Sequence, residues 1–271
     1  MIRVKRPIAR HALDRIARVA LIESHRRARR DLAPGHPSIQ SRWKYFRSQR
    51  PDDAGQKVFE ALLTAFNHKC VYCEQVAPRT IDHVFPKAAY PSRMFKWTNF
   101  LAACHSCNIS RGEGLPLGAD GAPLLLDPTR DEPLDYWSWD SLTGAALDCP
   151  QQGRRERAEA TRVSFSLHLY NDERLHKAKD LRFLLARVIR EEPVSPETME
   201  RLRGLLLPSR PWLGVVREIL LRPRQEAEHR LVEAALEKLP EMRGWVSSWL
   251  RPPAWAAERW PALPAGDGVT Q

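Results

Sequence analysis

Two Cys-x-x-Cys pairs constrain this chain more than any other feature of its sequence. Cys70 and Cys73 form the first pair, and Cys104 and Cys107 form the second. Thiolates at this spacing suit one tetrahedral zinc ion that takes two ligands from each pair. Because protein would fill all four positions, we predict a structural Zn²⁺ that adds on the order of 10 kcal/mol to folding. Two independent redox dithiols are the alternative, but neither pair opens a helix after the strand of a βαβ unit.

The stretch between the two pairs carries a structural signal of its own. It spans residues 74–103, a length of 30 residues, whereas an ordinary zinc ribbon places about 15 to 20 residues between its pairs. The helical period is absent here, and residues 79–84 and 97–101 are predicted as short strands separated by a loop at Pro91-Ser92. We therefore expect a two-stranded unit between the cysteine pairs.

An acid, a histidine and an amide lie within or beside this stretch. Asp82 and His83 are adjacent, and Asn108 follows Cys107 directly. Hydrolysis of a phosphodiester needs a base that activates water and a cation that neutralises phosphate oxygens. His83 has the chemistry of the base, while Asp82 and Asn108 offer the oxygen ligands that Mg²⁺ prefers. Neighbouring strand residues point to opposite faces, so Asp82 and His83 reach one site only if the strand ends there, as Pro86 permits.

This pattern resembles the HNH endonuclease motif, the ββα-metal fold, in its four-cysteine zinc form. The H-N-H signature falls on His83, Asn99 and Asn108. The resemblance implies that His83 is the general base and that Asn99 braces the loop between the strands. It also implies that Asp82 and Asn108 hold a catalytic Mg²⁺ or Mn²⁺.

Two cationic residues accompany the motif. Arg111 stands where many HNH members have lysine, and Lys87 follows shortly after the Asp-His pair. The resemblance implies that both side chains contact phosphate.

A narrower resemblance, over roughly residues 55–190, is to the PtuB family, the HNH subunits of Septu anti-phage systems that also occur with some retrons. The segments that carry it are Cys70-Val71-Tyr72-Cys73-Glu74, Ile81-Asp82-His83 with Pro86-Lys87, Trp97-x-Asn99-Phe100-Leu101, Cys104-His105-Ser106-Cys107-Asn108, and Leu126-Asp127-Pro128 with Asp131-x-Pro133. Members of that family work beside a PtuA-like ATPase of the ABC type. The sequence has no Gly-x-x-x-x-Gly-Lys-Ser/Thr loop, so ATP hydrolysis would come from such a partner.

The positive charge of the chain is concentrated at its N-terminus. Residues 1–50 hold 14 Lys/Arg and three Asp/Glu, whereas the other 221 residues hold 29 and 30. A positive arm on a nearly neutral body favours a polyanion such as DNA, because Lys/Arg contacts to phosphates release counterions. A solvated helix face is the alternative. Four arginines are the candidates for nucleic-acid contact in this arm: Arg26, Arg27, Arg29 and Arg30.

Outside the cysteine segment the apolar pattern is helical, which predicts an α+β fold that is mostly α-helical. Four segments are expected: a basic N-terminal helical arm (1–54), a zinc-bound HNH core (55–130), a helical region (131–250), and a tail containing Pro and Trp (251–271). Helices are predicted at 154–170 and at 172–190, the second entered through Asn171, and after Ser195-Pro196, Pro211 and Pro223. The tryptophans Trp245, Trp249, Trp255 and Trp260 are expected either to form a partner surface or to cap the helical core.

The location of the protein is also predicted from composition. No apolar run reaches the roughly 18 residues of a membrane helix, and no signal-peptide core is present, so we expect a bacterial cytoplasmic protein. The Arg-rich start contains Asp14 and Glu23 and lacks the serines of a transit peptide, which favours a retained basic helix.

Together these features predict a metal-dependent DNA endonuclease that acts as the effector of an anti-phage complex with an ATPase. Two alternatives stay open. One is a stand-alone HNH enzyme of the restriction or homing type, and the other is an inert zinc-stapled module that binds nucleic acid.

Overall fold

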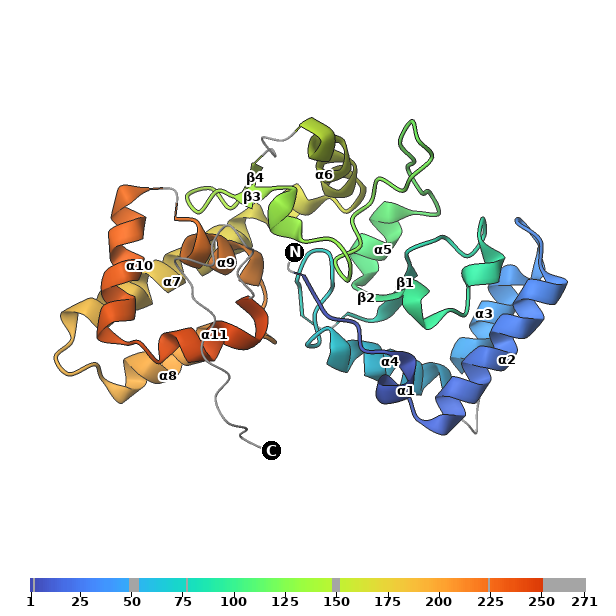
Figure 1. Ribbon diagram of the computed structural model, residues 1–271, viewed down its shortest axis with the longest axis horizontal. Helices are drawn as coiled ribbons and strands as arrows, with labels where there is room; N and C mark the ends of the chain where they lie inside the picture. Colours follow the sequence, from blue (N-terminus) through green and yellow to red (C-terminus); the bar gives the residue numbers. More distant parts are fainter. Residues whose placement is uncertain (2, 49–53, 77, 148–151, 224, 251–271) are drawn as a thin grey trace. The chain divides into compact units, whose positions relative to one another are not determined.

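The computed structural model describes residues 1, 3–48, 54–76, 78–147, 152–223 and 225–250 (Figure 1). Helices dominate and the strands are short, so the predicted α+β, mostly helical class is confirmed. None of the described helices is both long enough and apolar enough to cross a membrane. The predicted tail (251–271), with Trp255 and Trp260, lies outside the described residues.

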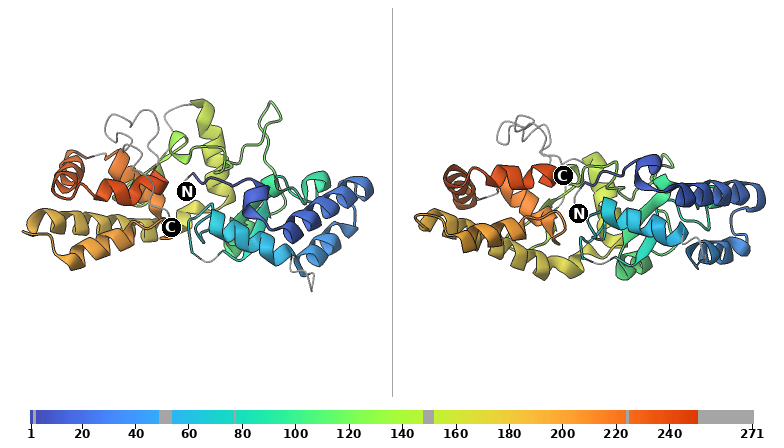
Figure 2. Two further views of the ribbon diagram at one scale, coloured as in Figure 1. Left: turned by 60° about the horizontal axis from the view of Figure 1, so that its bottom comes forward. Right: turned by 90° about the horizontal axis from the view of Figure 1, so that it is seen from below.

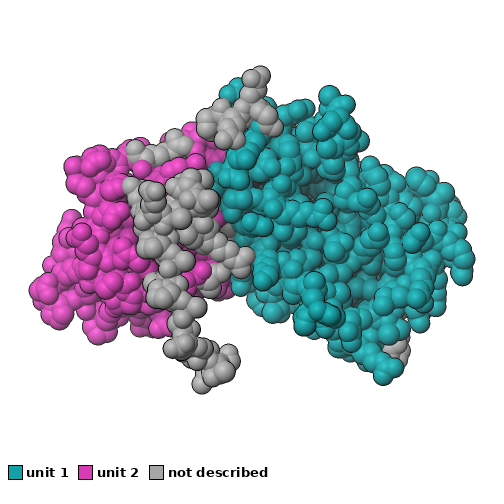
Figure 3. All heavy atoms as spheres, viewed as in Figure 1, with its two compact units in different colours: residues 1–136, 148–167 teal, residues 137–147, 168–271 magenta. Residues whose placement is uncertain are grey.

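The chain divides into two compact units, coloured separately in Figure 3. Unit 1 comprises residues 1–136 and 148–167, and unit 2 comprises residues 137–147 and 168–271. The predicted N-terminal arm and the predicted HNH core both belong to unit 1. Every site residue predicted from the sequence therefore lies in unit 1.

Four helices form the N-terminal part of unit 1, seen from two further directions in Figure 2 (blue to cyan): α1 (Ala9–Ala12), α2 (Arg15–Asp31), α3 (Ser38–Ser48) and α4 (Ala54–Ala65). The helix α2 begins where the Asp14 carboxylate accepts a hydrogen bond from the Ala17 amide at 2.7 Å. Both α2 and α3 pack against α4. The apolar period of α3 is weak, because only Ile39 and Phe46 are buried along it.

A two-stranded antiparallel sheet and one helix form the centre of unit 1: β1 (Thr80–His83), β2 (Phe100–Ala103) and α5 (His105–Arg111). In the register of the sheet Asp82 lies opposite Leu101 and His83 lies opposite Phe100. All four residues of β2 are buried, which agrees with its continuous apolar sequence. Because α5 follows β2 directly, the chain order here is β-β-α (Figure 1).

The second strand begins three residues later than the sequence predicted. Residues 97–99 form a short 3-10 helix, η2 (Trp97–Asn99), in which the Asn99 amide donates to the Lys96 carbonyl at 2.8 Å. A second 3-10 helix, η1 (Pro91–Arg93), lies in the same loop. The strand starts late because the Asn99 side chain is used to hold this loop, as described below.

The helix α6 (Gln152–Ser164) completes unit 1 and is fixed by the Asp-Pro segment around residue 127. The Leu126 amide donates to the Thr161 hydroxyl at 2.9 Å, and the Arg157 guanidinium pairs with the Asp131 carboxylate at 2.8 Å. The 3-10 helix η3 (Pro133–Asp135) follows this segment. The resemblance segment 126–133 therefore has a structural use, which is to hold α6 in place.

Unit 2 contains the remaining elements: β3 (Ser138–Trp139), β4 (Ala146–Leu147), α7 (Asn171–Arg190), α8 (Pro196–Leu205), α9 (Leu213–Leu221), α10 (Glu226–Lys238) and α11 (Met242–Leu250), with the 3-10 helix η4 (Leu167–Tyr170) before α7. The long helix α7 packs against α8, α9 and α10. The helix α8 begins after Ser195 as predicted, since the Ser195 hydroxyl accepts from the Thr198 amide.

Two details of unit 2 differ from the expectations. The N-cap position of α7 is Tyr170 rather than Asn171, whose side chain instead accepts a hydrogen bond from Arg174 at 3.1 Å. Trp249 is buried, and its indole nitrogen donates to the Leu206 carbonyl at 2.8 Å. Of the two interpretations of the tryptophans, Trp249 follows the one that places it in the helical core.

Candidate active site and four-cysteine metal centre

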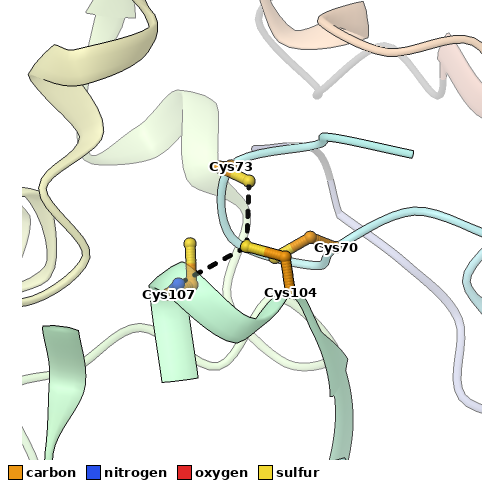
Figure 4. A group of neighbouring side chains, drawn as sticks. All are labelled: Cys70, Cys73, Cys104 and Cys107. Carbon is orange, nitrogen blue, oxygen red and sulfur yellow. Dashed lines mark hydrogen bonds between the residues drawn. The ribbon is translucent and has the colours of Figure 1, made fainter. Parts of the chain in front are cut away.

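The four predicted zinc ligands come together in unit 1. Cys70 and Cys73 lie in the loop after α4, Cys104 caps the N-terminus of α5, and Cys107 lies in its first turn. Their sulfur atoms all lie within 4.8 Å of one another, and all four residues are buried and free of disulfides (Figure 4). The sulfurs of Cys73 and Cys104 are 3.7 Å apart. Tetrahedral zinc with Zn–S bonds of ~2.3 Å separates its ligands by about 3.8 Å, so this group fits a zinc ion.

Backbone hydrogen bonds hold the first cysteine loop against the sheet. The Val71 amide donates to the Ala102 carbonyl of β2 at 3.0 Å, and the Cys70 amide donates to the Gln75 carbonyl at 2.8 Å. The Gln75 amide in turn points at the Cys73 sulfur at 3.4 Å. These contacts link the cysteine cluster to β2, so the cluster and the β-β-α unit form one structure.

Asp82 is buried on the face of β1 that meets Tyr72 and α5. The Tyr72 hydroxyl donates to Oδ2 of Asp82 at 2.6 Å, and Arg111 donates to Oδ1 at 2.5 Å. Burial, and then the nearby Asp82 carboxylate, raises the pKa of Tyr72 well above its usual value, so the phenol stays a donor. In this arrangement the Asp82 carboxylate is neutralised by the Arg111 guanidinium, and Asp82 is 3% exposed.

His83 lies on the other face of β1 and is only 5% exposed. Its Nε2 is 3.0 Å from the Met94 carbonyl oxygen, which can only accept, so Nε2 carries the proton and Nδ1 carries the lone pair. Among the described residues, Nδ1 has no hydrogen-bond partner. Burial, with the charge of Lys87 as the second cause, lowers the pKa of His83 to about 3. The imidazole is therefore neutral at physiological pH, as a general base must be before it accepts a proton.

Asn99 holds the loop between the two strands at three points. Its Oδ1 accepts from the Phe85 amide at 2.7 Å, and its Nδ2 donates to the carbonyls of Phe85 at 3.0 Å and Arg93 at 3.1 Å. Met94, which receives the His83 hydrogen bond, follows Arg93 directly. Asn99 thus positions the carbonyl that sets the tautomer of His83.

Asn108 lies on α5, and its half-buried side chain leaves the helix three residues before Arg111. Residues three apart share one side of a helix, so Asn108 lies on the side from which Arg111 reaches Asp82. Among the described residues, no hydrogen bond joins the two predicted oxygen ligands, Asp82 and Asn108. Their chemistry fits a hard divalent cation such as Mg²⁺.

The two predicted phosphate contacts have different surroundings. Lys87 is half-buried, and its charge acts on His83. Arg111 is buried, and besides its bond to Asp82 it donates to the carbonyls of His83 at 2.5 Å and Val84 at 2.7 Å. The Arg111 side chain therefore connects α5 to the end of β1 instead of facing solvent.

The four predicted arm contacts lie on α2 and are all exposed: Arg26, Arg27, Arg29 and Arg30. Arg27 pairs with Glu23 at 3.6 Å and Arg30 pairs with Asp31 at 2.6 Å. Arg6, in contrast, is nearly buried and donates to the Thr98 carbonyl at 2.7 Å. Arg6 adds to the positive charge of residues 1–50, but its hydrogen bonds to the carbonyls of Thr98 and Phe100 give it a structural role.

An aromatic wall that the sequence did not predict lies beside His83. The Trp43 ring of α3 meets the His83 imidazole edge-on with 4.5 Å between centroids, and Phe100 meets it from β2 at 5.4 Å. Phe46 and Phe95 lie behind Trp43, with ring centroids 5.8 and 6.0 Å from it. The only sequence signal was the group of three aromatic residues, Trp43, Tyr45 and Phe46, between polar neighbours.

Part of this chain is similar to a curated protein. The Septu protein PtuB of Bacillus thuringiensis is 33% identical over 81 residues, which are 28% of this chain and 30% of that protein. The match thus spans less than a third of the length of either protein. No protein-family model matches the chain.

Proposed function

We propose that this chain is an HNH-type endonuclease that hydrolyses DNA phosphodiesters with a divalent cation, Mg²⁺ or Mn²⁺. The observation that carries the proposal is the hydrogen bond from Nε2 of His83 to the Met94 carbonyl, in a β-β-α unit attached to a four-cysteine centre. It leaves a neutral imidazole with its lone pair on Nδ1, which is the form needed to take a proton from water. The similarity to a Septu protein supports the same proposal.

The predicted site residues each have a role in this reaction, with Asp82 on one face of β1 and His83 on the other. Asn99 fixes the loop that carries Met94, so it is a positioning residue, while His83 takes the proton from the attacking water. Asp82 and Asn108 would hold the cation, which neutralises charge on the phosphate when it is bound. Arg111 anchors Asp82 and the end of β1. Lys87, whose charge acts on His83, would contact the phosphate.

We further propose that the nuclease serves anti-phage defence in a complex with a PtuA-like ATPase of the ABC type. This follows from the similarity to a Septu protein and from the absence of a phosphate-binding loop in the sequence. Co-expression with the product of the neighbouring gene tests it, and we expect the two chains to co-purify at a fixed ratio. A chain that stays alone yet cleaves DNA would favour the stand-alone restriction or homing enzyme.

A cleavage assay separates the nuclease from an inert binding module. Purified protein is incubated with supercoiled plasmid after removal of divalent ions, and Mg²⁺ or Mn²⁺ is then added back. Because the two sites differ in ligand chemistry, we expect cleavage to return with these ions while the thiolate-bound zinc stays in place. Binding of DNA without cleavage under every ion condition would leave the zinc-stapled binding module as the better description.

A further inference from the structure

A cavity of about 410 Å³ lies between α2 and α3 in unit 1, on the N-terminal arm. It is lined by Ser24, Arg27, Ser41, Arg42, Tyr45, Phe46 and Phe95. Its volume falls in the range of sites that hold one small ligand, ~300–1,000 Å³. One lining residue, Arg27, is also among the four arginines predicted to contact nucleic acid.

Aromatic side chains form its apolar part. Phe46 and Phe95 are buried, with ring centroids 5.2 Å apart. Tyr45 is 64% exposed, although a tyrosine ring normally gains from burial. An exposed ring next to two buried ones is the arrangement that stacks a planar aromatic ligand, as nucleobases stack on tyrosine in proteins that bind single strands.

Two arginines and two serines supply its polar part. Arg27 forms an exposed pair with Glu23 at 3.6 Å, and Arg42 contacts Asp31 at 3.2 Å. A guanidinium has five N–H donors, so each arginine keeps donors for a further anion. The cavity therefore combines apolar aromatic surface with donors suited to phosphate, on the part of the chain with the highest positive charge.

We propose that this cavity binds one nucleotide of a single DNA strand, with its base stacked on Tyr45 and its phosphate held by Arg27 and Arg42. The inference rests on the proposed nuclease function and names the form of nucleic acid that the arm recognises. A paired base in a duplex is stacked on its neighbours and cannot enter such a cavity without being flipped out. The arm thus selects unpaired or easily unpaired DNA.

The cavity also connects to the proposed base through side-chain contacts. Phe46 and Phe95, which line it, both contact Trp43, and Trp43 lies against His83. A DNA strand with one nucleotide in this cavity would therefore be bound to α3, the helix whose Trp43 contacts His83.

The test is equilibrium binding of a labelled single-stranded oligonucleotide and of the matching duplex, by fluorescence anisotropy at several salt concentrations. Tyr45→Ala should weaken single-strand binding roughly tenfold, as expected for the removal of one stacked base, with an unchanged salt slope. Tyr45→Phe, which keeps the ring, should bind like the wild type. The double variant Arg27→Gln, Arg42→Gln should instead reduce the log–log salt slope by about 0.7 for each phosphate that is no longer bound.

Phe183→Ala is the matched control, because Phe183 is an exposed ring (55%) on α7 in unit 2 and should leave binding unchanged. Wild-type affinity in a folded Tyr45→Ala variant would overturn this inference and leave the nuclease proposal intact. If Tyr45→Ala weakened binding of the single-stranded oligonucleotide and of the duplex by the same factor, the single-strand preference would be overturned. If free mononucleotide at the same concentration displaced the oligonucleotide, the occupant of the cavity would be a free nucleotide and not a DNA strand. If the wild type bound no DNA, both proposals would be overturned.

Discussion

The imidazole of His83 donates from Nε2 to the carbonyl oxygen of Met94 at 3.0 Å. This single contact selects the tautomer of His83 and directs its lone pair to Nδ1. The carbonyl is in turn held by Asn99, which binds the neighbouring Arg93 carbonyl at 3.1 Å. Two side chains of the predicted H-N-H signature, His83 on β1 and Asn99, thus both bind the loop that carries the Met94 carbonyl.

Replacement of His83 should abolish cleavage while the fold is kept. In His83→Gln the side-chain amide is still able to donate to the Met94 carbonyl, but no base is present, so cleavage should fall by about 10²- to 10⁴-fold. Plasmid cleavage in Mg²⁺, with zinc content and circular dichroism as folding checks, measures this. His176→Ala, an exposed histidine on α7, is the control and should cleave normally. Full activity in folded His83→Gln would remove His83 from the mechanism.

Removal of one thiolate should cost both zinc and stability. The Cys104 side chain caps α5 by accepting from the Cys107 amide at 3.4 Å, so Cys104→Ser removes a ligand next to the helix that carries Asn108. Structural zinc contributes on the order of 10 kcal/mol, so most of the variant should be insoluble. Elemental analysis should give one zinc per wild-type chain and almost none in the variant. The lone Cys149, outside the described residues, provides the control Cys149→Ser. Active wild type without zinc would contradict the structural role.

Arg111 should act mainly on stability. Its guanidinium neutralises the buried Asp82 carboxylate, and removal of one partner of a buried ion pair typically costs about 3–5 kcal/mol. Arg111→Met should therefore unfold at clearly lower urea concentration than wild type, whereas Arg155→Met, at an exposed position of α6, should not. If Arg111→Met kept wild-type stability but reduced the salt slope of DNA binding, Arg111 would make the phosphate contact that the resemblance to HNH endonucleases implies.

The exposed arginines of α2 should supply affinity and leave the chemical step unchanged. Replacing Arg26, Arg27, Arg29 and Arg30 with Gln should weaken DNA binding and reduce the log–log salt slope by up to about 0.9 for each phosphate that the arm no longer binds. The cleavage rate at saturating protein should stay near that of wild type. If the salt slope of DNA binding did not change, the exposed arginines of α2 would form a solvated face or bind a protein partner.

Unit 2 should show an acid-sensitive contact that is independent of the proposed nuclease site. The Glu191 carboxylate accepts hydrogen bonds from the Ser195 amide at 3.0 Å and from the Thr198 hydroxyl at 2.9 Å. The bond from the Ser195 amide is the largest cause that lowers the pKa of Glu191 to about 2. A lowered carboxyl pKa stabilises the fold above the ordinary pKa of Glu, and this contribution disappears as the pH falls towards 2.

We therefore expect Glu191→Gln to lower the melting temperature most near pH 7, less below pH 4, and hardly at all near pH 2. Melting curves across this range measure the difference from wild type. Glu237→Gln, at an exposed position of α10, is the control and should follow the wild type throughout. A difference that stays constant with pH would show that the ionised carboxylate is not what stabilises this turn.

Several parts of this protein could be predicted from sequence because their causes are local. Cysteine spacing predicted a four-thiolate group, and the four sulfurs do lie within 4.8 Å of one another. The strand at 80–83 falls inside the predicted range of 79–84. The cap of α8 is set by Ser195, whose side chain acts on its own helix. In each case the deciding interaction is between residues of fixed chemistry at a fixed separation along the chain.

Other parts were decided only by tertiary structure, because they depend on which distant residues share one environment. Charge alone assigns Arg6, Arg111 and Arg26 to one class, yet the first two are buried against backbone carbonyls while Arg26 is exposed. The helix α3 has too weak an apolar period to be predicted, although its Trp43 forms the wall beside His83. The sequence determined which groups can do chemistry, whereas the burial of an imidazole and the tautomer it adopts follow from residues that folding brings to it from far along the chain.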